Sequence, residues 1–121
     1  MKHIYDRAGS LNRMGGDEAL FREMVGLLRE DAPRWLAELH GALQDSDLSR
    51  ARRAAHTLKG LAANFGASRA MAAAAEMERL VKTETSEGMP GAETELEEAL
   101  LELVAALDEN VVARDETRVP R

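Results

Sequence analysis

The sequence of 121 residues lacks cysteine and is poor in aromatic residues and proline. Without cysteine, disulfides and thiolate metal sites are excluded. Only four aromatic side chains and a few scattered β-branched residues are present. Because these residue types are enriched in strands, the sequence gives little indication of β-structure. The longest uninterrupted apolar run covers only residues 70–75, whereas a membrane helix needs ~20 such residues. The N-terminus also lacks a basic segment followed by an apolar one, so neither a membrane span nor a secretory signal is expected.

Charge is unevenly distributed in this acidic chain, whose formal net charge is −6. That excess argues against a nucleic-acid-binding protein, which needs a basic surface. Residues 83–113 contain nine acidic residues and no Lys or Arg. Residues 48–75 contain no acidic residue and five basic ones: Arg50, Arg52, Arg53, Lys59 and Arg69. This segment predicts a site for a small anion or an acidic partner, although a solvated helix face would carry the same charges.

Helix-forming residues dominate the composition, and their arrangement predicts the fold class. We expect an all-α protein: an antiparallel four-helix bundle with a short N-terminal helical extension around residues 5–14. Residues 1–113 should form this single domain, and residues 114–121 a disordered tail. Such a domain is expected to be soluble and cytoplasmic.

Caps and breakers predict where the long helices begin and end. Asp17 is expected to cap the first of them, and Pro33 to kink it or to start a new helix. Further helices are expected at 48–64, 68–83 and 93–112, with a loop at 87–91. Trp35 should be a packing anchor. The apolar stripe of the first long helix is expected to consist of Leu20, Met24, Leu27 and Leu28, with Phe21 beside them.

The helix at 48–64 carries a regular apolar seam and, beside it, a histidine. The seam follows steps of three and four residues: Leu48, Ala51, Ala55, Leu58, Ala62 and Phe65. At roughly 100° per residue, His56 lies off this seam and should be exposed. Four residues share its side of the helix, namely Arg52, Lys59, Gly60 and Ala63.

These neighbours suit phosphoryl transfer. Gly60 costs ~1 kcal/mol in an exposed helix relative to alanine, and its lack of bulk would let another protein approach His56 closely. Neutral imidazole is a nucleophile, and the ammonium of Lys59 would reach a phosphoryl group on Nε2 and stabilise its charge. Arg52 and Arg53 would add to that field. An ordinary exposed histidine remains the alternative interpretation of His56.

The segment 55–67 resembles the signature of histidine-containing phosphotransfer (HPt) domains, written H-x-L-K-G with a glycine six residues further on. Segments 16–20, 31–33 and 75–78 are also similar to that family, so the resemblance spans residues 10–110. It implies that His56 carries the phosphoryl group, that Lys59 stabilises it and that Gly60 gives steric clearance. Ala63 and Asn64 would border the docking surface, with apolar positions such as Met24 or Val25. Leu61 and Ala62 depart from the small polar residues often found there.

The resemblance also implies a function and its partners. The chain would relay a phosphoryl group between His56 and the aspartate of a response-regulator receiver domain, or of a hybrid histidine kinase, in two-component signalling. It would be a phosphocarrier without kinase activity and without a cofactor of its own, since the Mg²⁺ would belong to the receiver. We expect a monomer that binds neither nucleic acid nor membrane.

The sequence leaves other functions to be weighed against this one. A catalytically silent bundle that only docks on a signalling partner is the main alternative. A histidine kinase dimerisation domain is disfavoured, because Thr57 stands where such domains carry an acidic residue and no nucleotide-binding glycine-rich loop is present. His3 and His40 share no metal-ligand spacing with His56.

Overall fold

The computed structural model describes residues 4–117, and their side chains as far as residue 108. Within 4–117 the secondary structure is entirely helical, which confirms the predicted fold class. No helix in this range is long and apolar enough to cross a membrane. The elements are α1 (Arg7–Arg13), α2 (Glu18–Gln44), α3 (Leu48–Ala63), α4 (Ser68–Lys82), the 3₁₀ turn η1 (Ser86–Gly88) and α5 (Met89–Thr117).

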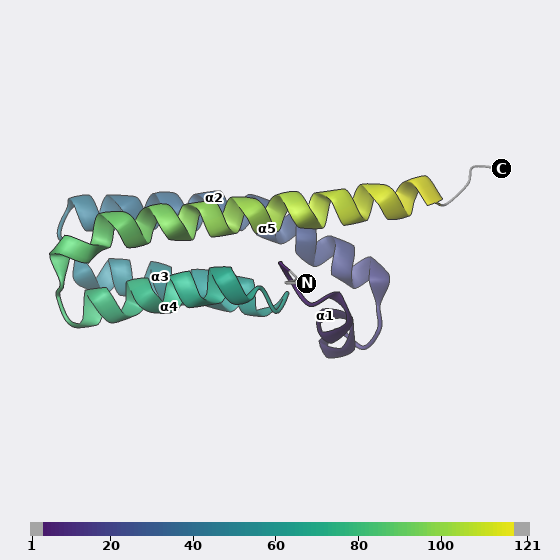
Figure 1. The fold of residues 1–121 in the computed structure, drawn as a ribbon, viewed down its shortest axis with the longest axis horizontal. Coiled ribbons are helices and arrows are strands. Elements are labelled where there is room, and N and C mark those ends of the chain that lie inside the picture. The colour runs from purple at the N-terminus through teal and green to yellow at the C-terminus, as the bar shows by residue number, and fades with distance from the viewer. Residues whose placement is uncertain (1–3, 118–121) are drawn as a thin grey trace.

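The four long helices form an antiparallel bundle with two layers (Figure 1). The helices α2 and α5 lie in one layer, and α3 and α4 in the other. Contacts run from α2 to α3, from α3 to α4, from α4 to α5 and from α5 back to α2, so α3 and α5 occupy opposite corners. The short α1 packs at one end, and α5 runs on past α3 and α4. The predicted bundle with an N-terminal helical extension is therefore confirmed.

Aspartates determine where three of the helices begin. Asp6, Asp17 and Asp47 each precede a helix, and each carboxylate accepts a hydrogen bond from the backbone N–H three residues later. Such a cap satisfies a donor that has no partner within the helix and contributes about 1 kcal/mol. The predicted cap at Asp17 and the predicted helix start at residue 48 are both confirmed, and both follow from this local chemistry.

Proline positions account for two differences from the predicted boundaries. Helix α2 continues through Pro33, so the expectation of a new helix there is wrong. Pro33 removes one backbone hydrogen bond, but both halves of α2 still bury apolar side chains against the core. Helix α5 begins at Met89 rather than 93, because Pro90 falls in its first turn, where an N–H would have no helical partner. The loop expected at 87–91 is correspondingly shorter.

At the C-terminus, the backbone of α5 is helical as far as Thr117. The first four residues of the segment expected to be disordered, 114–117, therefore belong to this helix. Residues 118–121 lie outside the described residues.

The buried residues confirm the apolar seam of α3 and correct the stripe of α2. In α3, Ala51, Ala55, Leu58 and Ala62 are fully buried as expected. In α2, Leu28 is buried as expected, but Leu20 and Leu27 are 36% and 44% exposed, so their predicted places in the stripe are wrong. As far as Ala32, the buried side chains of α2 are Phe21, Val25, Leu28 and Ala32. Phe21 sets this register by packing edge-to-face on Phe65, with ring centroids 5.8 Å apart.

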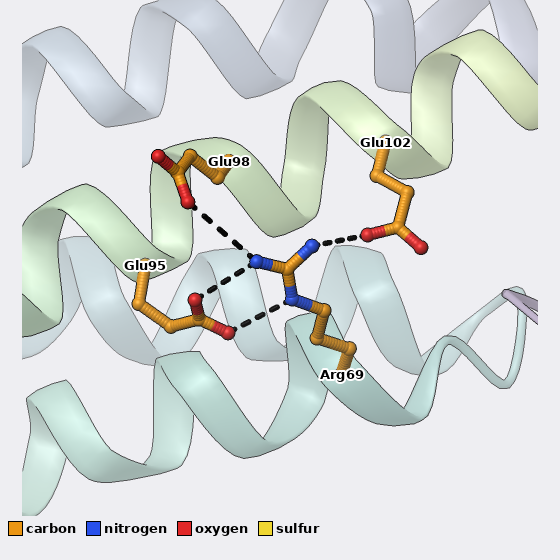
Figure 2. Close-up of polar contacts among 4 residues, drawn as sticks. All are labelled: Arg69, Glu95, Glu98 and Glu102. Atoms are coloured by element: carbon orange, nitrogen blue, oxygen red, sulfur yellow. Dashed lines mark hydrogen bonds and ion pairs between the residues drawn. The ribbon is translucent and has the colours of Figure 1, made fainter.

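An arginine on α4 binds three glutamates of the acidic α5 (Figure 2). Arg69 donates from Nε and Nη2 to the two carboxylate oxygens of Glu95, at 2.9 and 2.8 Å. It also contacts Glu102, and Glu98 at 3.7 Å. These bonds raise the pKa of Arg69 and lower that of Glu95, chiefly through the hydrogen bonds between them. The charge of Arg69, one of the five basic residues of segment 48–75, is thus neutralised by the glutamates of α5 and is unavailable to a partner.

Replacing Arg69 with glutamine is expected to lower the melting temperature more at pH 7 than at about pH 3. A carboxyl group whose pKa is lowered on folding, such as Glu95, stabilises the fold above its unfolded pKa. This contribution disappears as the pH falls through the folded pKa. Thermal melts of both proteins at the two pH values test this. An equal drop in melting temperature at both pH values would mean that Arg69 stabilises the fold through the packing of its aliphatic stem.

Candidate functional site

His56 lies on the outer face of α3, as its position off the seam predicts. Its side chain is 71% exposed, whereas its neighbours Ala55 and Leu58 are fully buried. The same helix therefore anchors itself in the core and presents the imidazole to solvent.

A glutamate from the neighbouring helix α4 connects the two residues most directly implicated in chemistry. Glu78 Oε2 lies 3.3 Å from His56 Nδ1, and Glu78 Oε1 lies 2.7 Å from Lys59 Nζ. Glu78 is only 20% exposed, whereas Lys59 is 37% exposed. One half-buried carboxylate thus holds both the ring and the ammonium.

The electrostatics of this trio determine which nitrogen of His56 keeps its lone pair. Partial burial acts to raise the pKa of Glu78, but the hydrogen bonds and charges of Lys59 and His56 outweigh it and leave the pKa below its usual value. An ionised carboxylate only accepts hydrogen bonds. The contact with His56 therefore requires the proton on Nδ1, and the neutral ring then has its lone pair on Nε2.

Glu78 is a site residue to which the sequence pattern assigns no role. It belongs to the segment 75–78 that resembles the family, but nothing in that segment marks it as a partner of the histidine. It follows the fully buried Met77 and therefore lies at the border of the α4 seam. A carboxylate at the edge of a seam, on the helix that pairs with the histidine helix, is the signal that would have located it.

Lys59 occupies the expected side of α3 but has a partner that the sequence did not predict. Its ammonium pairs with Glu78 and is not free beside the imidazole. To contact a phosphoryl group on Nε2, Lys59 must share its donors between that group and Glu78, or exchange one for the other. An ammonium with three donors on a flexible stem is suited to either arrangement.

The structure brings some of the remaining predicted residues to His56 and places others further along α3. Arg52 and Arg53 are exposed and line a shallow depression with Ser49, His56 and Glu78. Gly60 lies one turn beyond His56, and a Cβ added to it would meet nothing within 4 Å. No packing contact among the described residues therefore requires a glycine there.

Ala63 and Asn64 lie at the end of α3, where α1 holds the backbone. Arg13 Nη2 donates to the carbonyl oxygens of Ala63 and Asn64, at 3.3 and 3.1 Å. Gly66 follows with a φ of +59°, and a Cβ there would lie 2.9 Å from Asp6 Cβ. Gly66 is therefore required by backbone conformation and packing, in contrast to Gly60.

Two further expectations concern docking and metal binding. Val25 is 2% exposed, so its predicted place on a docking surface is wrong; it faces the core, whereas Met24 is only partly buried. Among the described residues, no group of three or more His, Asp or Glu side chains is arranged to hold a metal ion.

Replacing Glu78 with glutamine is expected to slow phosphorylation of His56 about fivefold, because a neutral acceptor forms a bond about 1 kcal/mol weaker with Nδ1–H. Glu78 acts here as a positioning residue. The ¹⁵N shifts of the imidazole should show a smaller Nδ1–H fraction in the variant. A slower rate with unchanged tautomer populations would contradict this role.

Comparisons with known proteins agree with the fold and the signature. The family model described as "Hpt domain" matches residues 23–110. Among solved structures, histidine-containing phosphotransfer protein B from Pseudomonas aeruginosa PAO1 superposes with a TM-score of 0.82 at 22% identity, over 94% of this chain and 98% of that one. The maize phosphotransfer protein ZmHP2 gives 0.82 at 21% identity, over 95% and 88%.

A third neighbour is the HPT domain of a sensor hybrid histidine kinase from Shewanella, with a TM-score of 0.76 at 20% identity over 92% of this chain and 96% of that one. No curated protein matches the sequence significantly. The family match covers well over half of the chain and includes His56, Lys59 and Gly60. The chain therefore belongs to the Hpt domain family of two-component phosphotransfer proteins.

Proposed function

We propose that this chain relays a phosphoryl group between His56 and the aspartate of a receiver domain. The observation that carries the proposal is the pairing of an exposed imidazole with Glu78 through Nδ1. This arrangement leaves Nε2 as the nucleophile on a surface kept bare by Gly60. Family membership supports the role in two-component signalling.

The proposed reaction is a reversible transfer between two proteins. The lone pair of His56 Nε2 attacks the phosphorus of an aspartyl phosphate, an N–P bond forms, and the P–O bond to the aspartate breaks. The aspartate leaves as a carboxylate, and Nδ1 keeps its proton throughout. The ring then carries positive charge, which Glu78 offsets. Lys59, with Arg52 and Arg53, would stabilise the phosphoryl oxygens.

The chain supplies one half of this reaction. We propose that the receiver provides the aspartate and its Mg²⁺, and that this chain is a phosphocarrier without kinase activity. A cytoplasmic monomer fits this role. The docking-only alternative is less favoured, because a scaffold would be more stable with alanine at position 60.

Incubation with receiver domains phosphorylated by acetyl phosphate, in the presence of Mg²⁺, tests the proposal. The wild-type chain should gain one phosphoryl mass that acid removes, since phosphohistidine is acid-labile. Labelling by the small donor phosphoramidate, run in parallel, reports on the imidazole without any partner. Labelling by neither donor would favour the docking-only alternative.

A further inference from the structure

An open groove of about 620 Å³ runs between α2 and α5. All its lining residues belong to these two helices, so it opens on the side of their layer that faces away from α3 and α4 (Figure 1). Ion pairs between the two helices mark its ends, Arg29 with Asp108 and His40 with Glu93. The segment of α2 from Arg29 to His40 is about 16 Å long, or three turns. The groove is therefore long enough to hold a short helix.

The lining of this groove is apolar between the two ion pairs. Helix α2 contributes side chains that are too small to fill the space against the larger ones of α5. Leu101, midway between the ends, is 61% exposed and is the most exposed large apolar side chain within residues 4–108. Contiguous apolar surface that is open to solvent marks interaction sites. The apolar lining includes Ala32, Pro33, Ala37, Leu100, Leu101 and Val104.

The two layers of the bundle carry opposite charge. Helices α3 and α4 contain seven basic and two acidic residues, whereas α2 and residues 89–108 of α5 contain three basic and eleven acidic ones. Three arginines from other elements, Arg7, Arg50 and Arg69, bind glutamates of α2 and α5. When these three are counted as well, acidic residues still exceed basic ones by five, and His40 adds a positive charge only when it is protonated. The groove therefore lies in an acidic surface.

At the groove itself, one carboxylate is available to a partner. Glu97 lines the groove and is exposed, and within residues 4–108 it forms no ion pair or hydrogen bond. The other two lining charges that could attract a partner, Arg29 and Glu93, each have an oppositely charged or polar neighbour at the ends of the groove. The apolar surface is thus bordered by unneutralised negative charge.

We propose that this groove binds an amphipathic, basic helix of a partner protein. Large apolar side chains at helical spacing would contact Leu101 and the small residues of α2, and a lysine or arginine beside them would pair with Glu97. The site is separate from the proposed phosphotransfer site, because α3 presents His56 from the other layer. The chain would thus hold a second protein while His56 stays accessible.

The test measures binding of a fluorescent peptide of about 15 residues, with leucines at i, i+3, i+4 and i+7 spacing and lysines on the other face. Leu101→Gln is compared with Leu27→Gln, since both remove an exposed leucine but Leu27 lies outside the groove. Glu97→Gln is compared with Glu23→Gln, whose glutamate is also exposed and lies outside the groove. Circular dichroism verifies that all four variants are folded.

We expect Leu101→Gln to weaken binding of the lysine peptide about five- to tenfold, as truncation of a central interface residue does. Glu97→Gln should weaken it about two- to threefold at low salt. The two control variants should bind like the wild type. Equal effects of Leu101→Gln and Leu27→Gln, or no binding of the peptide up to about 1 mM, would overturn the proposal.

Control peptides and the oligomeric state separate the other occupants. Equal binding of a scrambled peptide of the same composition would overturn the proposal, since attraction to an acidic protein would then be sufficient. Equal binding after serine replaces every lysine would overturn it in favour of an uncharged apolar ligand. A wild-type dimer in sedimentation, lost in Leu101→Gln, would assign the groove to a second copy of the chain.

Phosphoramidate labelling of His56 keeps this inference distinct from the proposed function. Labelling should be equal with and without saturating lysine peptide. A loss caused by the peptide would place it at the phosphotransfer site and overturn the proposed groove. Absence of labelling without any peptide would instead count against the proposed function and leave the groove experiment unaffected.

Discussion

The variant His56→Gln is expected to lose all acid-labile phosphoryl label while keeping its fold. In the proposed transfer the imidazole supplies the nucleophilic nitrogen, and an amide nitrogen is no substitute for it. Because the side chain is 71% exposed, its replacement should change the free energy of unfolding by no more than about 0.5 kcal/mol. Intact mass before and after acid treatment measures the label.

His40 offers a matched control within the same chain. Its Nδ1 lies 2.7 Å from Glu93 Oε2, and its ring is 59% exposed. It therefore resembles His56 in being exposed and in having a glutamate at Nδ1, although its partner is Glu93 and that of His56 is Glu78. Three and four residues after it, however, stand Leu43 and Gln44 in place of a lysine and a glycine. His40 thus lacks both the cation and the clearance that the proposed phosphotransfer site around His56 has.

We expect His40→Gln to be labelled like the wild type. Equal labelling of wild type, His40→Gln and His56→Gln would place the phosphoryl group on another residue and contradict the assignment. Partial loss of label from each of the two variants would show that an exposed His–Glu pair is sufficient, and that the surroundings of His56 add little. The expected difference in labelling between His40→Gln and His56→Gln would show that Lys59 and Gly60 on α3, and not only an exposed His–Glu pair, are needed.

Local sequence information was sufficient for the part of the site that lies on one helix. His56, Lys59 and Gly60 share a face because the helical period places them there, and the seam of small residues from Ala51 to Ala62 fixes which face points outward. The helix starts follow in the same way from aspartate caps. These features depend on residues within one or two turns of each other.

Features that depend on packing between helices could not be predicted. Glu78 approaches His56 and Lys59 only because α4 pairs with α3. The predicted places of Leu20 and Leu27 in the α2 stripe are wrong, because the apolar residues of α2 are dense enough to define two overlapping stripes. Contact between Phe21 and Phe65 decides between them, and no pattern within α2 contains that information.

The variant Gly60→Gln is expected to slow transfer from a receiver by about a hundredfold, because a displacement of even 1 Å between reacting groups has an effect of that size. The bundle should become more stable by about 0.5–1 kcal/mol, since glutamine is the better helix former. A Cβ at position 60 would meet nothing within 4 Å, so any loss of transfer arises in the complex. Rapid-quench transfer kinetics and denaturant unfolding measure the two effects.

Gly91→Gln is the matched control, because Gly91 also has open space around it and lies on α5 at the opposite corner from α3. Gly91→Gln should accept the phosphoryl group from the receiver at the wild-type rate. Phosphoramidate is small enough to reach Nε2 past a glutamine, so its labelling of Gly60→Gln should fall much less than transfer from the receiver. Equal losses with both donors would mean that residue 60 perturbs His56 itself. Full transfer to Gly60→Gln would show that the partner does not need the space, and the glycine would then have no role that the structure explains.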